Sequence, residues 1–329
     1  MAWAGKTEGK GRGVLSAATE IGTDWEEAWE RGRGMLEGVA RRRVKGASGE
    51  VELAVLDWGG EGDLVLLHHA NGFCAATLAP IAKALRDRFR VVSIDARGHG
   101  DSTAVSPVGE PDPYAWQTLA RDLGTAVGEL LLLTGHERVA LAIGHSFGGA
   151  LILKAASAQP ADFERLLLCD PVILPPMTPE EQAARSDSIG LASATRKRRD
   201  RFPSREAAFE HFRSRALFEN FTPEALALYV GEGMAETTEG EVALKCDRNV
   251  EAAIFGGGGA SASIDDVDRV TAEVVFVHAE RGNFLREVYE DVASRMTHAR
   301  VESLDVGHLF PLEEPECVLK LVDEWLGNA

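Results

Sequence analysis

The chain has 329 residues, of which 45% are hydrophobic and 26% are charged, and its formal net charge is −17. This composition is ordinary for a folded protein and excludes disorder over most of the chain. The negative charge repels polyanions, so we expect no nucleic-acid and no membrane partner.

Residues 1–37 are predicted to form an N-terminal extension, partly helical and partly flexible. Trp25 and Trp29 lie four positions apart, which places both indole rings on one face of a short helix. The first residues lack the apolar run of a signal peptide, and no apolar run approaches the roughly 18 residues that span a bilayer. The four cysteines are widely spaced, which indicates free thiols in a reducing compartment. We therefore expect a cytoplasmic protein.

Strands and helices alternate from residue 38 onward. A hairpin over "ARRRVKG" and "VELAVLDW" precedes six short apolar strands with helical stretches between them. Strands that are apolar on both faces indicate a mostly parallel sheet with helices on each side, which is an α/β fold. The six predicted strands are 63–69, 90–96, 138–144, 165–171, 273–279 and 300–306. The predicted helices are 75–88, 114–134, 147–158, 284–297 and 315–326.

One region, residues 171–265, interrupts this alternation. It holds helical segments such as "SREAAFEHFRSRALF", several prolines and the four glycines from Gly256 to Gly259. An all-helical insertion between two strands of the sheet is best explained as a lid over the carboxyl edge, with its flexible part at the four glycines. The two parts of the α/β core would then be residues 38–170 and 266–329.

A serine lies between glycines where a predicted strand meets a predicted helix, in "ALAIGHSFGGALIL". This strand-turn-helix setting is that of a nucleophile elbow, which would display Ser146 on a strained turn. Attack on an ester carbonyl needs preset N–H donors for the developing charge, and the N–H of Phe147, directly after the serine, is predicted to be one. A serine also needs a base, and His308, on a loop after the last strand, is the candidate. His145 is set aside because it points to the other side of the turn.

Four motifs, in this order, resemble the α/β-hydrolase superfamily in its lidded, serine-nucleophile, esterase-like branch. They are "LLHHANGF", "IDARGHGDS", "GHSFGG" and "VGHLFPLEEPE". The resemblance implies an α/β-hydrolase fold over most of the chain. It also implies that Asn71, aligned through His69-Ala70-Asn71 with a His-Gly-x pattern, supplies the second N–H of the oxyanion hole. In the same superfamily the loop that holds His99 is structural.

The triad acid departs from the superfamily's common pattern. Many relatives carry an aspartate in a Gly-x-x-Asp turn after the seventh strand, but the matching residues here are Ala279-Glu280-Arg281-Gly282. Two candidates stay open, Asp170 at the end of the sixth strand and Glu280. We favour Asp170, because it follows the nucleophile by one helix and one strand on the same edge of the sheet.

These features predict a serine hydrolase that cleaves a carboxylic ester or a related acyl compound through an acyl-enzyme on Ser146, without a metal or an organic cofactor. A thioesterase, a lactonase and a carbon–carbon hydrolase share this machinery, and a non-catalytic ligand receptor on the same fold also stays open. The basic run from Arg196 to Arg199 stands alone in an acidic chain and indicates a solvated helix face. Apolar residues of the predicted lid favour a small, hydrophobic ester as substrate: Leu217, Phe218, Phe221, Leu226, Leu228 and Tyr229.

Overall fold

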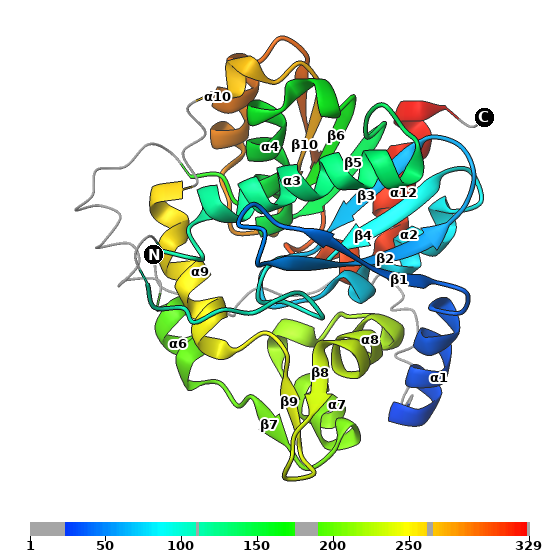
Figure 1. The fold of residues 1–329 in the computed structure, drawn as a ribbon, viewed down its shortest axis with the longest axis vertical. Coiled ribbons are helices and arrows are strands. Elements are labelled where there is room, and N and C mark those ends of the chain that lie inside the picture. The colour runs from blue at the N-terminus through cyan, green and yellow to red at the C-terminus, as the bar shows by residue number, and fades with distance from the viewer. Residues whose placement is uncertain (1–23, 110–111, 175–189, 262–265, 328–329) are drawn as a thin grey trace, which may run out of the picture.

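The computed structural model describes residues 24–109, 112–174, 190–261 and 266–327 (Figure 1). Its centre is an eight-stranded sheet with the order β1-β2-β4-β3-β5-β6-β10-β11. The first two strands and the β2–β4 pair are antiparallel, and all other neighbours are parallel, which confirms the mostly parallel sheet. The strands are β1 (Ala40–Lys45), β2 (Glu52–Gly59), β3 (Leu64–His68), β4 (Arg90–Ile94), β5 (Leu141–His145), β6 (Arg165–Cys169), β10 (Glu273–Ala279) and β11 (Ala299–Leu304).

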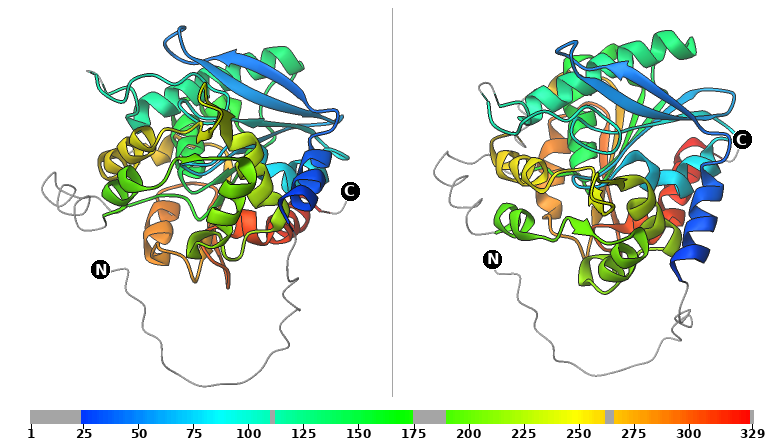
Figure 2. Two further views of the ribbon diagram at one scale, coloured as in Figure 1. Left: turned by 90° about the horizontal axis from the view of Figure 1, so that it is seen from below. Right: turned by 60° about the horizontal axis from the view of Figure 1, so that its bottom comes forward.

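Helices cover both faces of this sheet (Figures 1 and 2). One face carries α3 (Trp116–Thr134), α4 (Phe147–Ala158) and α10 (Arg286–Ser294), and the other carries α2 (Ala79–Leu85) and α12 (Pro315–Leu326). Alternate side chains of one strand enter different cores, as in β3, where Val65 packs toward α2 and Leu66 toward α3. Short helical turns lie at Ala75–Leu78, Pro160–Asp162, Val267–Arg269 and α11 (Phe310–Glu313).

The insertion, by which we mean residues 190–261 between β6 and β10, forms a separate group of elements below the sheet in Figure 1. Its helices are α6 (Leu191–Lys197), α7 (Arg205–Arg213), α8 (Pro223–Gly233) and α9 (Arg248–Ser261), with a helical turn at Ala216–Phe218. It also contains a small antiparallel sheet of β7 (Arg201–Phe202), β9 (Val242–Leu244) and β8 (Met234–Glu236). The described part of the insertion is therefore mostly helical and adds no strand to the main sheet, but the expectation that it is all-helical is wrong. Strands of two or three residues are too short to leave an alternating pattern in the sequence.

The glycines Gly256 to Gly259 do not form a loop. They lie within α9. The flexibility that we expect at this place stays a prediction. Residues just before them anchor the helix, because Val250 and Ile254 are buried and the indole N–H of Trp116 donates a hydrogen bond to the carbonyl of Ile254. Parts of the predicted lid, residues 175–189 and 262–265, lie outside the described residues.

The predicted helix around Trp25 and Trp29 is present as α1 (Trp25–Met35), whereas residues 1–23 lie outside the described chain. The two indole rings stack with centroids 5.5 Å apart. A Cβ atom on Gly231 of α8 would lie 2.1 Å from the Trp29 ring, so the glycine allows α1 to pack closely on the insertion. An ion pair of 2.6 Å between Arg31 and Glu224 joins the same two helices.

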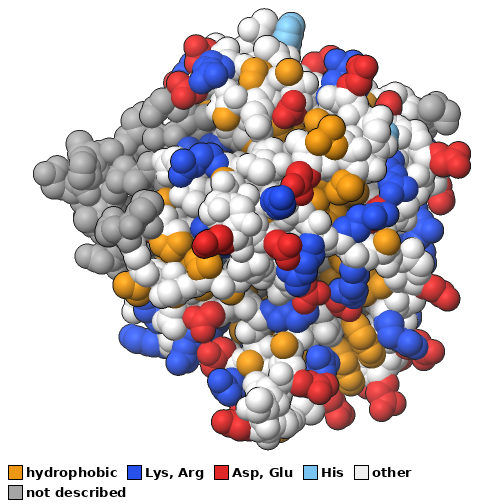
Figure 3. All heavy atoms as spheres, in the orientation of Figure 1, with side chains coloured by type: hydrophobic (Ala, Val, Ile, Leu, Met, Phe, Trp, Pro, Cys, Tyr) orange, Lys and Arg blue, Asp and Glu red, His pale blue; other side chains and the backbone are white. Residues whose placement is uncertain are grey.

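Charged side chains of both signs are interspersed over the face shown in Figure 3. All four cysteines are free, as expected, and three of them are buried. No helix in the described ranges is long and apolar enough to cross a membrane.

Candidate active site

Ser146 lies at the sharp turn between β5 and α4, with φ 55° and ψ −116°. Among the described residues, only Ser146 and Asp170 have a positive φ without being glycine. Such a backbone conformation costs about 1–3 kcal/mol and persists only where the surroundings enforce it. Two hydrogen bonds enforce it here, because the N–H of Ser146 donates to Cys169 O over 2.9 Å and Val172 donates to Ser146 O over 3.1 Å.

The chain around Ser146 is packed so closely that two neighbouring positions leave no room for a side chain. A Cβ atom on Gly144 would lie 2.6 Å from the Cα of Gly149, and one on Gly148 would lie 2.5 Å from His69 O. The elbow therefore requires glycines at both positions. The second contact also shows that the loop after β3 presses on the first turn of α4.

The structure brings Ser146, His308 and Asp170 together in one hydrogen-bonded row. The Nε2 atom of His308 is 2.9 Å from Ser146 Oγ, and its Nδ1 atom is 2.6 Å from Asp170 Oδ2. An ionised Asp170 would fix the proton of the imidazole on Nδ1, which leaves Nε2 free to accept the proton of the serine. Asp170 is completely buried, and Ser146 is only 6% exposed.

Asp170 is held by groups that sequence reasoning did not identify. Its Oδ1 atom accepts a hydrogen bond of 3.2 Å from the N–H of Ala279 and lies 3.1 Å from the hydroxyl of Tyr289. That hydroxyl is also 2.8 Å from Pro171 O. Tyr289 comes from α10, more than a hundred residues along the chain, so no local pattern could reveal the contact. The alternative acid, Glu280, is exposed on the surface.

Gly282 stands at the position where many relatives carry the triad aspartate, and its surroundings explain why no acid is found there. A Cβ atom on Gly282 would lie 2.7 Å from Asp170 Oδ2 and 2.9 Å from Ala279 O. The space that a side chain at this turn would need therefore holds the carboxylate of Asp170. An acid at the end of β6 and a side chain at residue 282 exclude each other sterically.

The two predicted oxyanion donors lie at the start of α4 and on the loop after β3. Phe147 is the first residue of α4 and has no carbonyl one turn earlier to which its N–H could donate. On the loop after β3, the N–H of Gly72 donates to His99 Nε2 over 3.0 Å and that of Phe73 to Ala70 O over 3.1 Å, while in the described chain Asn71 N has no partner. Gly72, with φ +84°, provides a left-handed turn on this loop.

Buried histidines support this loop. The Nδ1–H of His99 donates to Arg97 O, which leaves its Nε2 to accept from Gly72. Burial lowers the pKa of His99 to about 4, so the ring is neutral near pH 7. This arrangement agrees with a structural role for the His99 loop.

His145 contacts the backbone of the candidate base rather than the nucleophile. Its Nε2–H donates to the carbonyl oxygen of His308 over 2.8 Å. Burial lowers the pKa of His145 to about 3, so this ring is also neutral. Its side chain helps to place the loop of His308, a role that the sequence analysis missed.

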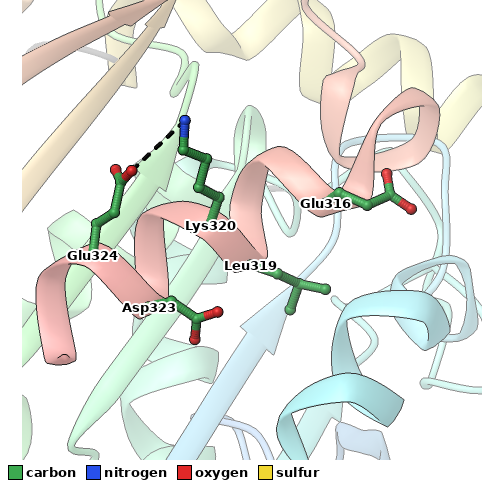
Figure 4. Close-up of a pocket in the computed structure, with 5 residues that line it drawn as sticks. All are labelled: Glu316, Leu319, Lys320, Asp323 and Glu324. Carbon is green, nitrogen blue, oxygen red and sulfur yellow. Dashed lines mark ion pairs between the residues drawn. The ribbon is translucent and has the colours of Figure 1, made fainter. Parts of the chain in front are cut away.

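One surface depression lies elsewhere, on α12 (Figure 4). Its side chains are charged or aliphatic, and Lys320 pairs with Glu324 over 3.6 Å. It contains none of the candidate residues. In the part of the chain that the structure describes, no group of three His, Cys, Asp or Glu side chains could hold a metal ion.

The fold and this cluster agree with the comparison to known families. The model of the alpha/beta hydrolase family matches residues 64–318, which is most of the chain, and the chain therefore belongs to this family.

Individual relatives match over shorter lengths. Protein phosphatase methylesterase 1 of Homo sapiens is 31% identical over 122 residues, which cover 35% of this chain and 29% of the relative. The sn-1-specific diacylglycerol lipase ABHD11 of Danio rerio is 37% identical over 116 residues, which cover 34% of this chain and 33% of the relative. The matched part thus amounts to about a third of each relative's length. Among solved structures, E-2-(acetamidomethylene)succinate hydrolase aligns with a TM-score of 0.71 at 20% identity, over 88% of this chain and 100% of that one.

Proposed function

We propose that this protein is a serine hydrolase that cleaves a carboxylic ester through an acyl-enzyme on Ser146. The observation that carries the proposal is the row from Ser146 through His308 to Asp170, with contacts of 2.9 and 2.6 Å. A buried serine with this strained backbone has no evident purpose in packing. Two of the relatives are named as a methylesterase and a lipase, which supports an ester as the substrate.

The chemistry follows from the positions of these atoms. Ser146 Oγ attacks the carbonyl carbon while its proton passes to His308 Nε2. The carbonyl oxygen becomes an oxyanion, which accepts hydrogen bonds from the N–H groups of Phe147 and Asn71. The C–O bond to the alcohol then breaks, and the alcohol leaves with the proton from His308. Water then attacks the acyl carbon while His308 takes its proton, and the acid leaves as Ser146 Oγ takes the proton back. The carboxylate of Asp170 stabilises the imidazolium.

The insertion serves as a lid in this proposal. Ser146 is only 6% exposed, which supports a cover over the site. Phe73, which follows the oxyanion loop, packs against three aromatic rings of the insertion, those of Phe218, Phe221 and Tyr229, at centroid distances from 5.2 to 6.3 Å. These rings offer an apolar wall beside the site. Leu217, which we expected to contribute, is instead half exposed.

The proposal is tested with a series of 4-nitrophenyl esters, from acetate to dodecanoate, on the wild type and on Ser146→Ala. We expect turnover that varies with acyl length in the wild type and none above background in the variant. A thioester and a lactone of matched chain length separate the related activities. Binding of these compounds without turnover of any of them would contradict the proposal and favour a receptor.

A further inference from the structure

The basic run does not form a uniformly solvated face, because one of its members points inward. Arg196, Lys197 and Arg199 are exposed, whereas the side chain of Arg198 is only 24% exposed. Arg198 directly follows α6, which lies beside α9 in Figure 1. Burying a guanidinium is costly unless a partner compensates the charge.

The partner that the structure gives Arg198 also touches the oxyanion loop. Arg198 Nη2 is 2.5 Å from Oε2 of Glu251, whose residue is 6% exposed. The backbone oxygen of Glu251 accepts a hydrogen bond of 3.2 Å from the side chain of Asn71, and its Oε1 lies 2.6 Å from the place where a Cβ on Gly72 would be. One side chain therefore separates the guanidinium from the loop that carries the proposed Asn71 donor.

This pair leaves hydrogen-bonding capacity unused. The ion pair between Arg198 and Glu251 lacks the direction of a hydrogen bond, and Nε and Nη2 of Arg198 and Oε2 of Glu251, all buried, make no directed hydrogen bond among the described residues. The side chain of Tyr229 is a further hydrogen-bonding neighbour of Arg198. Nε and Nη2 form one edge of the planar guanidinium. That edge is the one that holds a carboxylate through two parallel N–H···O bonds.

We propose that Arg198 binds a carboxylate of the substrate, so that the preferred substrates are half-esters of dicarboxylic acids. The ester part of this statement rests on the proposed function. The scissile ester would lie at Ser146, an apolar spacer along Phe73 and Tyr229, and the free carboxylate at the Nε–Nη2 edge of Arg198, where it would replace Glu251. The exposed basic neighbours attract an anion to this part of a chain that otherwise repels it.

Glu251 can give up its hold on Arg198 when a second carboxylate arrives. Burial raises the pKa of Glu251 to about 7, although Arg198 acts in the opposite direction. A substrate carboxylate beside Glu251 raises that pKa further, so Glu251 takes up a proton and Arg198 pairs with the substrate. Four neighbouring titratable groups stay neutral near pH 7. Burial raises the pKa of Tyr229, Cys246 and Cys74. Burial lowers the pKa of His99.

The test measures binding apart from catalysis. Monomethyl succinate, glutarate and adipate, and the corresponding dimethyl esters, are titrated calorimetrically into full-length Ser146→Ala protein. We expect at least one monomethyl ester to bind about 10 to 100 times more tightly than its dimethyl ester, in line with a charge-assisted hydrogen-bonded pair. Adding Arg198→Gln should abolish this preference without weakening dimethyl ester binding, and Arg198→Lys should retain part of it.

The matched control is Arg196→Gln, an exposed member of the same run, which should leave the preference unchanged. An equal loss of affinity for both ester types in Arg198→Gln would overturn the proposal and make the buried pair structural. Equal affinity of the parent protein for both types would also overturn it. Turnover of 4-nitrophenyl esters by the wild type reports separately on the hydrolase, so either claim can fail while the other stands.

Discussion

Replacing Asp170 by asparagine tests the candidate acid without changing the size of the side chain. The amide can offer His308 either an NH₂ group, which repels the Nδ1 proton, or a neutral oxygen, which stabilises the imidazolium far less than a carboxylate. In the first case the imidazole proton moves to Nε2, which can then no longer accept the serine proton across the 2.9 Å contact. By analogy with other serine-hydrolase triads we expect kcat to fall about 10⁴-fold, equivalent to about 5 kcal/mol.

The assay is steady-state hydrolysis of a 4-nitrophenyl ester, with a thermal melt to show that the variant folds. A modest loss of stability, about 1–3 kcal/mol, is expected if the amide nitrogen faces the N–H of Ala279 and one hydrogen bond is lost. Glu280→Gln is the matched control, because this residue is exposed and should stay within about threefold of the wild type. The reasoning would be refuted if Asp170→Asn kept a tenth of wild-type kcat, or if Glu280→Gln lost more than Asp170→Asn.

Three further outcomes are expected. Ser146→Ala and His308→Ala should each abolish ester turnover, and their double variant should be little worse than either, since one loss already disables the unit; additive losses in kinetic assays would show that they act separately. Gly282→Ala places a Cβ 2.7 Å from the buried carboxylate, so we expect kcat to fall at least tenfold with a small change in KM, and an unchanged kcat would contradict the steric argument. Burial lowers the pKa of His68 and His99 to about 4 from an ordinary 6.5, so the unfolded chain takes up these protons first. Their contribution to stability is complete above pH 6.5 and is lost at about 1.4 kcal/mol per histidine and pH unit as the pH falls toward 4. The melting temperature should therefore decrease over this range, and a flat profile would argue against neutral buried histidines.

The nucleophile elbow could be predicted because its signal is local. A strand, three glycines and a helix occupy fourteen consecutive residues, and the serine conformation follows from their spacing. His308 and Asp170 could be predicted for a similar reason, since each follows a strand whose carboxyl end meets the same edge of the sheet. The alternation of apolar strands and helices predicted the sheet and its two layers.

Contacts made by distant elements could not be predicted in this way. Tyr289 reaches Asp170 from α10, Glu251 reaches the oxyanion loop from α9, and neither residue stands out in its own segment. The glycines from Gly256 onward suggested a flexible segment because glycine is a weak helix former, but they belong to a helix whose preceding apolar residues are buried. Arg198 resembled its exposed neighbours in sequence, and only the tertiary structure distinguishes it.

The most direct test of the central claim is labelling of the folded wild type with a fluorophosphonate, followed by peptide mass spectrometry. We expect one adduct, on the peptide that contains Ser146, with no adduct in Ser146→Ala and a rate reduced by orders of magnitude in His308→Ala. Absence of an adduct in folded wild-type protein, or an adduct on another residue that persists in Ser146→Ala, would contradict the assignment of Ser146 as the nucleophile.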